Sequence, residues 1–120
     1  MKLIRFGTEG NEKAGLQLEN KRIDVSAFGE DYNERFFETD GLERLKVWLK
    51  NNEKNCPIIN DSVRLGSPIA RPSKLVCVGL NYAKHAAEAG MKVPNEPVLF
   101  FKSTTAIVGP NDDVIIPKNS

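Results

Sequence analysis

The second half of the chain opens with the sequence KLVCVGLNYAKHAAEAG, residues 74–90. Residues 75–78 are a short, β-rich apolar run, which is typical of a buried strand. Gly79 and Leu80 follow as turn residues, and Asn81 is placed to cap a helix that runs to about Ala89, with Gly90 as its stop. The sequence therefore predicts a strand, a tight turn and a short helix. Such a turn is a common way to hold a reactive side chain at the edge of a rigid sheet.

Two further apolar runs follow this helix. Residues 97–101 predict another buried strand, and residues 114–116 predict a third, entered through the turn residues 110–113. Three apolar strands and one short helix cannot bury one another in about 50 residues. We therefore expect this second part to be completed by more polypeptide or by another chain.

The start of the chain predicts a small β-meander. The side chains of residues 2–6 alternate between the two faces of a predicted strand. Residues 14–25 contain two short strand patterns, 16–18 and 23–25, with a turn at residues 20–21. Residues 26–39 are mixed in character. Their aromatic side chains are expected to cover the sheet, and these are Phe28, Tyr32, Phe36 and Phe37.

A helix is predicted from Asp40 to Asn52. Asp40 is placed to cap its first turn, with Glu43 completing a capping box. Its apolar stripe at helical spacing consists of Leu42, Leu45, Trp48 and Leu49. We interpret Trp48 as a core residue and not as a binding platform.

The stretch 55–73 predicts a linker, because it contains Pro57, Pro68 and Pro72 and has only one short extended piece at residues 63–65. The domain boundary is placed near residue 70. This gives a small N-terminal domain, residues 1–70, and the beginning of a second domain, residues 71–120. The predicted fold class is α+β and rich in β-structure.

Composition excludes several classes of function. The chain is 40% hydrophobic and 28% charged with a net charge of +1, so electrostatics give no case for nucleic acid or an anionic membrane surface. No apolar run approaches the roughly 20 residues that span a bilayer, and the polar start does not fit a signal peptide. Cys56 and Cys77 form no metal-ligand spacing or disulfide framework, and Cys77 is interpreted as a buried thiol. The cytoplasm is the expected location.

His85 is the candidate for chemistry. It lies three residues before Glu88 on the predicted helix, so imidazole and carboxylate share a face, with Tyr82 one turn earlier. A carboxylate beside an imidazole orients it and stabilises its protonated form. The alternative is a surface salt bridge without a catalytic role.

Three other polar features stay ambiguous from the residues alone. Lys102 follows the predicted strand 97–101, where it either reaches solvent or faces a substrate carboxylate. Asp112 and Asp113 look like a metal pair, but before a strand such residues more often form a turn. The Ser-Thr-Thr cluster at residues 103–105 either lines a site or ends a strand.

Taken together, three segments resemble the fumarylacetoacetate hydrolase family in order and spacing. They are CVGLNYAKHAAE at residues 77–88, PVLFFK at 97–102 and GPNDDVIIP at 109–117. The start MKLIRFG, residues 1–7, is similar to the small N-terminal region of the bacterial branch. That branch includes ureidoglycolate lyase, a sugar-derived diketo-acid hydrolase, and an isomerase or decarboxylase of the homoprotocatechuate pathway, which acts on 2-hydroxyhepta-2,4-diene-1,7-dioate.

The resemblance implies a mixed β-roll catalytic domain, usually in a homodimer. It also implies Mg²⁺ or Mn²⁺ bound by an E-x-E pair and a later aspartate, because hard carboxylate oxygens suit such ions. The ion would hold a β-dicarbonyl or 2-oxo acid substrate and stabilise an enolate as a C–C bond breaks. By position, His85 would be the general base and Glu88 its orienting partner, on a helix that forms part of a lid. Substrate-side residues would be Lys102, Tyr82 and Asn81.

No E-x-E pair follows residue 73. We therefore expect the metal ligands beyond residue 120, and we expect this chain alone to bind no catalytic metal tightly and to turn over nothing. The leading hypothesis is the N-terminal portion of a metal-dependent hydrolase, decarboxylase, lyase or isomerase. The alternative is a complete, non-catalytic binding or assembly module, or an inactive fragment of such an enzyme. A third hypothesis, a nucleic-acid-binding module, is not supported, because the sequence has no stripe of basic residues.

Overall fold

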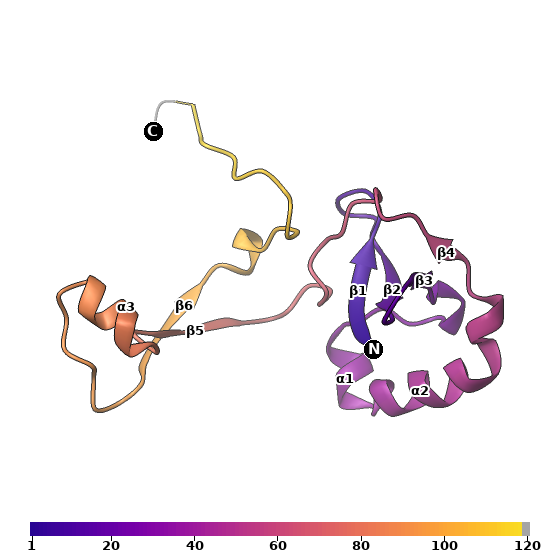
Figure 1. The fold of residues 1–120 in the computed structure, drawn as a ribbon, viewed down its shortest axis with the longest axis horizontal. Helices are drawn as coiled ribbons and strands as arrows, with labels where there is room; N and C mark the ends of the chain where they lie inside the picture. The colour runs from indigo at the N-terminus through magenta and orange to yellow at the C-terminus, as the bar shows by residue number, and fades with distance from the viewer. Residues whose placement is uncertain (119–120) are drawn as a thin grey trace. The chain divides into compact units, whose positions relative to one another are not determined.

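The computed structural model describes residues 1–118, and the chain divides into two compact units. The first unit is Met1–Arg71 together with the segment from Val108 onward, and the second is Pro72–Ile107. Figure 1 traces both along the chain. The division after Arg71 lies beside the boundary expected near residue 70, but the segment from Val108 packs with the first unit. The assignment of residues 1–70 and 71–120 to two domains stays a prediction.

A four-stranded antiparallel sheet forms the first unit, in the order β1-β2-β3-β4. The strands are β1 (Lys2–Phe6), β2 (Lys13–Gln17), β3 (Arg22–Asp24) and β4 (Ile58–Ile59). Leu16 pairs with Leu3 on one side and with Ile23 on the other, so these apolar side chains share a face. The predicted β-meander is confirmed.

The fourth strand is a correction to the predicted linker. Ile58–Ile59 pairs with Arg22 and Ile23 of β3, and a single bridge joins Leu65 to Phe6 of β1. A strand of two residues is too short to show a periodic hydrophobic pattern. It forms because its backbone pairs with the edge of β3. The stretch after the helix therefore returns to the sheet.

Two helices cover the core of this unit, α1 (Glu34–Glu38) and α2 (Gly41–Asn52), and Figure 1 shows them along one side of it. Short 3₁₀ turns lie at Ser26–Phe28 (η1) and Glu53–Asn55 (η2). The buried core cluster consists of Ala14, Leu16, Ile23, Val25, Tyr32, Phe36 and Leu45. Trp48 packs against this cluster with its ring centroid 5.7 Å from that of Phe28, which confirms its core role.

The start of α2 differs from the predicted capping box. Asp40 adopts a left-handed backbone with φ of 53°, and its side chain makes no capping hydrogen bond. The reason is α1, which the sequence did not predict and which ends just before Asp40, so this residue turns the chain between two helices. Asn33 is the residue that caps a helix here, since its Oδ1 accepts from the Phe36 N–H. Leu42, expected in the buried stripe, is 39% exposed.

The second unit is a two-stranded antiparallel hairpin with one helix. Its elements are β5 (Leu75–Gly79), α3 (Ala83–Glu88), β6 (Val98–Lys102) and the 3₁₀ turn η3 (Thr104–Ala106). Both strands were predicted, but not their surroundings: every residue of β6 is exposed, and Cys77 is only half-buried. Two strands alone have no layer to pack against, so their apolar side chains meet solvent.

The strand expected at residues 114–116 does not form within the described part of the chain. Val114, Ile115 and Ile116 are all exposed, and no partner strand lies beside them among residues 1–118. An apolar β-rich run needs an edge to pair with, and its pattern does not say whether one is present. Within the described residues, no helix is long and apolar enough to cross a membrane. The α+β class is confirmed.

Arg64 joins three segments of the first unit. Its Nε and Nη2 donate to the two carboxylate oxygens of Asp112 at 2.8 and 2.7 Å, and its Nη1 donates to Glu12 at 2.9 Å and to the Gly7 carbonyl at 3.1 Å. Asp112 also accepts from the Gly109 N–H. The predicted turn before residue 114 is therefore present, and both carboxylate oxygens of its first aspartate, Asp112, accept hydrogen bonds from Arg64.

Arg64 lowers the pKa of both carboxyl groups. For Asp112 the hydrogen bonds from Arg64 and from the Gly109 N–H hold the pKa below its ordinary 3.8. Burial alone would raise the pKa of Glu12, but hydrogen bonds and the charges of Arg64 and Arg5 outweigh it, and the pKa lies below its ordinary 4.5. Both groups therefore favour folding when they are ionised.

We expect Tyr32→Phe to destabilise the first unit. The Tyr32 hydroxyl is buried and donates to the Gly15 carbonyl at 2.8 Å, so its removal leaves a buried carbonyl without that partner. The expected loss in the free energy of unfolding is about 1–2 kcal/mol, measured by urea denaturation. The matched control is Tyr82→Phe, whose ring is 74% exposed and which should change nothing. Equal stability of Tyr32→Phe and the wild type would contradict the assignment of this bond.

We expect the first unit to lose stability as acid protonates Asp112 and Glu12. Because both pKa values are lowered by folding, the stabilisation is present above the ordinary values of 4.5 and 3.8 and is lost as pH falls through the lower folded values. Arg64→Met should flatten the dependence of the unfolding free energy on pH below 4.5. Denaturation series at several pH values measure this, and an unchanged slope in the variant would rule out the linkage.

Candidate active site

The second unit positions its polar residues through the turn between β5 and α3. Leu80 in this turn has a left-handed backbone with φ of 50°, and Tyr82, not Asn81, is the residue that precedes the helix. Tyr82 makes no side-chain cap, so the predicted Asn81 cap is wrong. The predicted stop at Gly90 is confirmed: φ is 66°, and its N–H donates to the Ala87 carbonyl at 3.0 Å.

An open hollow of about 280 Å³ lies beside this turn. Its walls come from the turn itself and from the loop at residues 93–97. Asn81 lines it, and Glu96 is the one ionisable residue in the lining. An amide and a carboxylate in one hollow can accept and donate hydrogen bonds to a small polar ligand.

His85 and Glu88 lie one turn apart on α3, and both are exposed. Among the described residues, no hydrogen bond or ion pair joins their side chains to each other or to any other group. Ala86 between them is fully buried and is the contact of the helix with its own unit. The spacing predicted a shared face, but an exposed pair at this spacing gains only a few tenths of a kcal/mol from contact. The orienting contact is not formed.

The other two substrate-side candidates lie away from the hollow. Lys102 pairs with Leu75, at the end of the hairpin opposite to Gly79, which pairs with Val98. Four residue steps along a strand separate these ends by about 13 Å. The side chain of Tyr82 is mainly in solvent. Of the five residues proposed from the sequence, Asn81 alone lines this hollow.

The described residues do not fit a catalytic divalent ion. Among residues 1–118, no group of three or more histidine, cysteine, aspartate or glutamate side chains comes together. Asp112 has both carboxylate oxygens bonded to Arg64, so it is not available as a hard oxygen ligand. The described residues therefore do not form a site that would hold such an ion.

Glu96 is the residue of this hollow that the sequence did not predict. It lies between Pro94 and Pro97, and two prolines so close together are a local sign of a fixed, non-helical backbone that holds a side chain in place. Glu96 is far from β5 in the sequence, so the sequence did not indicate that both line one hollow. Chemically, the unit offers an exposed imidazole on a short helix, and a hollow lined by two amides, Asn81 and Asn95, and by one carboxylate, Glu96.

Comparison with known proteins identifies this unit. Residues 74–120 match the family model described as "Fumarylacetoacetate (FAA) hydrolase C-terminal". Proteins named "Putative hydrolase" match along the whole chain, one from Burkholderia ambifaria at 45% identity and one from Burkholderia multivorans at 44%. Residues 74–120 belong to the fumarylacetoacetate hydrolase family.

One solved structure has a similar fold. A crystal structure described as a "putative HpcE protein" from Mycobacterium smegmatis superposes with a TM-score of 0.62 at 26% identity, covering 98% of this chain and 41% of that one. The chain likewise spans 42% of the length of the Burkholderia relatives. The chain thus corresponds to less than half of each of these relatives.

Proposed function

We propose that this chain supplies the proton-transfer helix of an enzyme that cleaves or rearranges a β-dicarbonyl or 2-oxo acid. The observation that carries the proposal is α3: the helix presents an exposed imidazole, His85, and the turn that leads into the helix lines a hollow with Asn81 and Glu96. An imidazole changes protonation near neutral pH, which suits it to move a proton between water and substrate. Hydrolysis, decarboxylation, lyase and isomerase reactions all need such a step.

In this proposal, His85 is the general base and Glu88 orients it once the helix closes over substrate. Catalytic contacts often tighten only in the complex with substrate, so the unformed contact between the two side chains does not oppose this role. Asn81 holds a polar group of the substrate in the hollow, and Lys102 and Tyr82 bind substrate from outside it. We place the enzyme in the cytoplasm, in keeping with its two free thiols.

We further propose that the reaction uses Mg²⁺ or Mn²⁺ with ligands outside this chain. The support is the match of residues 74–120 to the fumarylacetoacetate hydrolase family model, together with relatives that are more than twice as long as this chain. When bound, such an ion would supply Lewis acidity to the oxygens of the substrate. The chain alone is expected to be inactive.

The role of His85 is tested in a polypeptide that joins this chain to the remaining part of the Burkholderia ambifaria relative. Acylpyruvates and oxaloacetate are assayed with Mg²⁺, with Mn²⁺ and with chelator. We expect His85→Ala to lower kcat by about 100-fold or more, since general bases contribute at that scale. Lys84→Ala, an exposed neighbour on the same helix, is the matched control and should retain activity.

Full activity in His85→Ala would remove the histidine from the mechanism. The alternative function, a non-catalytic binding or assembly module, is supported by the unpaired His85 and Glu88 and by the apolar surface of the hairpin. That alternative would be favoured if the joined polypeptide were inactive in an assay in which the intact Burkholderia ambifaria relative is active.

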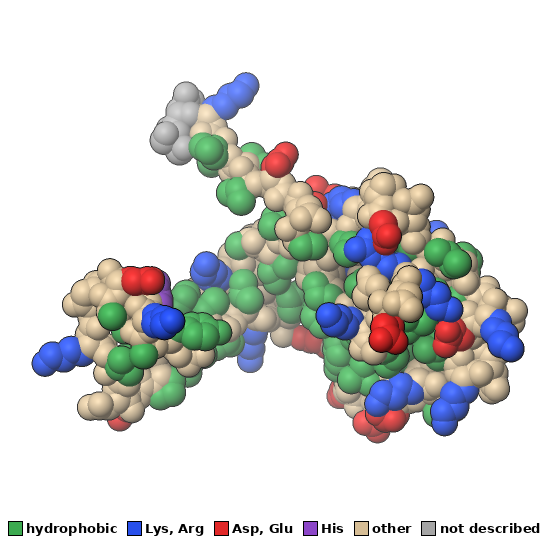
Figure 2. Space-filling model, in the orientation of Figure 1, with side chains coloured by type: hydrophobic (Ala, Val, Ile, Leu, Met, Phe, Trp, Pro, Cys, Tyr) green, Lys and Arg blue, Asp and Glu red, His purple; other side chains and the backbone are tan. Residues whose placement is uncertain are grey.

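We propose that the hairpin is an assembly face between two copies of the protein. Across the β5–β6 register, Val76 opposes Phe101 and Val78 opposes Leu99, so these four side chains share one face. All four are exposed, and Phe101 reaches 72%. Figure 2 shows hydrophobic side chains gathered along this hairpin. A contiguous apolar face of this kind is typical of a surface that another chain covers.

We expect the double variant Leu99→Ser/Phe101→Ser to reduce self-association. The 13.3 kDa chain should form dimers in light scattering after gel filtration, and the variant should shift toward monomer. The control is Val47→Ser/Ile58→Ser, which removes two exposed apolar residues from the first unit and should leave the dimer intact. A wild-type chain that stays monomeric at high concentration would overturn the assembly proposal.

A further inference from the structure

A second polar hollow, of about 460 Å³, lies within the first unit. It is bounded by β1, by the residues around the start of α1, and by the end of the unit at Ala70 and Arg71. Its polar lining consists of Arg5, Arg35, Arg71, Asp31, Asn33 and Glu34. Three arginines against two acidic residues leave a formal charge of +1 around it.

Arg5 is the fixed member of this set. Its side chain is only 12% exposed, and its Nε and Nη2 donate to the two carboxylate oxygens of Asp31 at 2.8 and 3.0 Å. Asp31 also accepts from the Tyr32 N–H at 2.9 Å. The Asp31 carboxylate is thus already occupied by protein donors, and it orients Arg5 instead of blocking the hollow.

Arg71 is held at the hollow by an unusual backbone. Its φ is 47°, a left-handed conformation that costs energy for any residue with a β-carbon. The residue before it is anchored, because the Ala70 N–H donates to the Tyr32 carbonyl at 2.8 Å. Strain of this sort is typical of residues whose placement serves binding.

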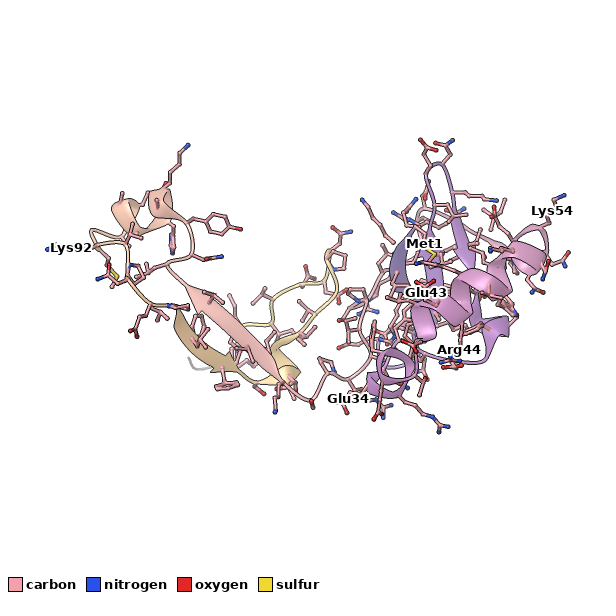
Figure 3. The ribbon with its side chains drawn as sticks, turned by 90° about the horizontal axis from the view of Figure 1, so that it is seen from below. Met1, Glu34, Glu43, Arg44, Lys54 and Lys92 are labelled. Carbon is pink, nitrogen blue, oxygen red and sulfur yellow. The ribbon has the colours of Figure 1, made fainter. Side chains whose placement is uncertain are left out.

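The remaining donors are less committed within the protein: the charge of Arg35 contributes to the lowered pKa of Glu30, but the hydrogen bond and charge of Arg44 contribute more. Among the described residues, neither Arg35 nor Arg71 has a carboxylate within ion-pair distance, and both are exposed. Asn33 accepts from the Phe36 N–H through Oδ1, which leaves its amide group as a donor. Arg44, which borders the neighbouring hollow, differs because it is paired with Glu30. Figure 3 shows Arg44 and Glu34 on α2 and α1.

We propose that this hollow binds a small oxyanion, a carboxylate or phosphate group, between the guanidinium groups of Arg35 and Arg71. Planar guanidinium forks match the oxygens of either group, and the volume is that of a small-molecule site. The site shares no residue with the His85 helix, so it stands independently of the catalytic proposal.

The test is an NMR titration of the ¹⁵N-labelled chain at neutral pH and constant ionic strength. Inorganic phosphate and succinate are added separately, with sodium chloride as the balancing salt. We expect saturable shifts at the amides of Asn33, Ala70 and Arg71 with at least one of them. Saturation by phosphate alone assigns a phosphate ligand, and saturation by succinate alone assigns a carboxylate. No saturation with either would overturn the proposal.

The decisive variant is Arg35→Gln/Arg71→Asn. Asparagine tolerates the left-handed backbone at residue 71, and both side chains are exposed, so the fold should persist. We expect binding to weaken by about tenfold or more when two charged donors are lost. The matched control is Lys50→Gln/Lys54→Gln, which removes the same charge from the end of α2 and from η2. Figure 3 places Lys54 away from Glu34. An equal loss of affinity in the control would mean that the anion is attracted by overall positive charge, and it would overturn the proposed site.

Discussion

The guanidinium group of Arg64 is the interaction on which the arrangement of the first unit depends. It bonds at once to the loop after β1, to Glu12 before β2, and to Asp112 in the last segment of the chain. These groups are 57, 52 and 48 residues away in sequence. A planar group with several donors can satisfy three acceptors in one place, which a lysine ammonium does with less geometric definition. Through this contact, the segment from Val108 packs with the first unit.

The two units differ in how completely they bury their apolar residues. In the first, a four-stranded sheet and two helices close around Tyr32, Phe36 and Leu45, and no described buried side-chain polar atom lacks a partner. In the second, a two-stranded hairpin leaves both strands largely exposed. The family match at residues 74–120 lies mostly in the unit with the open hairpin. The candidate chemistry therefore sits on a scaffold whose apolar surface is not covered by the described residues.

The candidate site illustrates what a linear pattern can and cannot predict. The i, i+3 spacing of His85 and Glu88 placed both side chains on one short helix, and the structure agrees. Their contact is a different matter, because two exposed, solvated groups gain little by pairing. Glu96 and the arginines at residues 35 and 71 went unnoticed, since they come from loops and ends of elements whose neighbours are set by the fold. The prolines at 94 and 97 indicate a fixed backbone from the sequence alone, whereas the left-handed backbone of Arg71 is known only from the structure.

Local sequence was sufficient for most elements of this protein. The strands β1, β5 and β6, the helices α2 and α3 and the stop at Gly90 follow from period, apolar content and turn chemistry, all of which act over a few residues. Tertiary structure alone decided the rest. It gave β4 its partner, placed Asp40 between two helices, left residues 114–116 without a partner strand among residues 1–118, and bonded Asp112 to Arg64. Each of these depends on a group far away in the chain, and pairing across such distances is set by packing and hydrogen-bond geometry, which no local pattern contains.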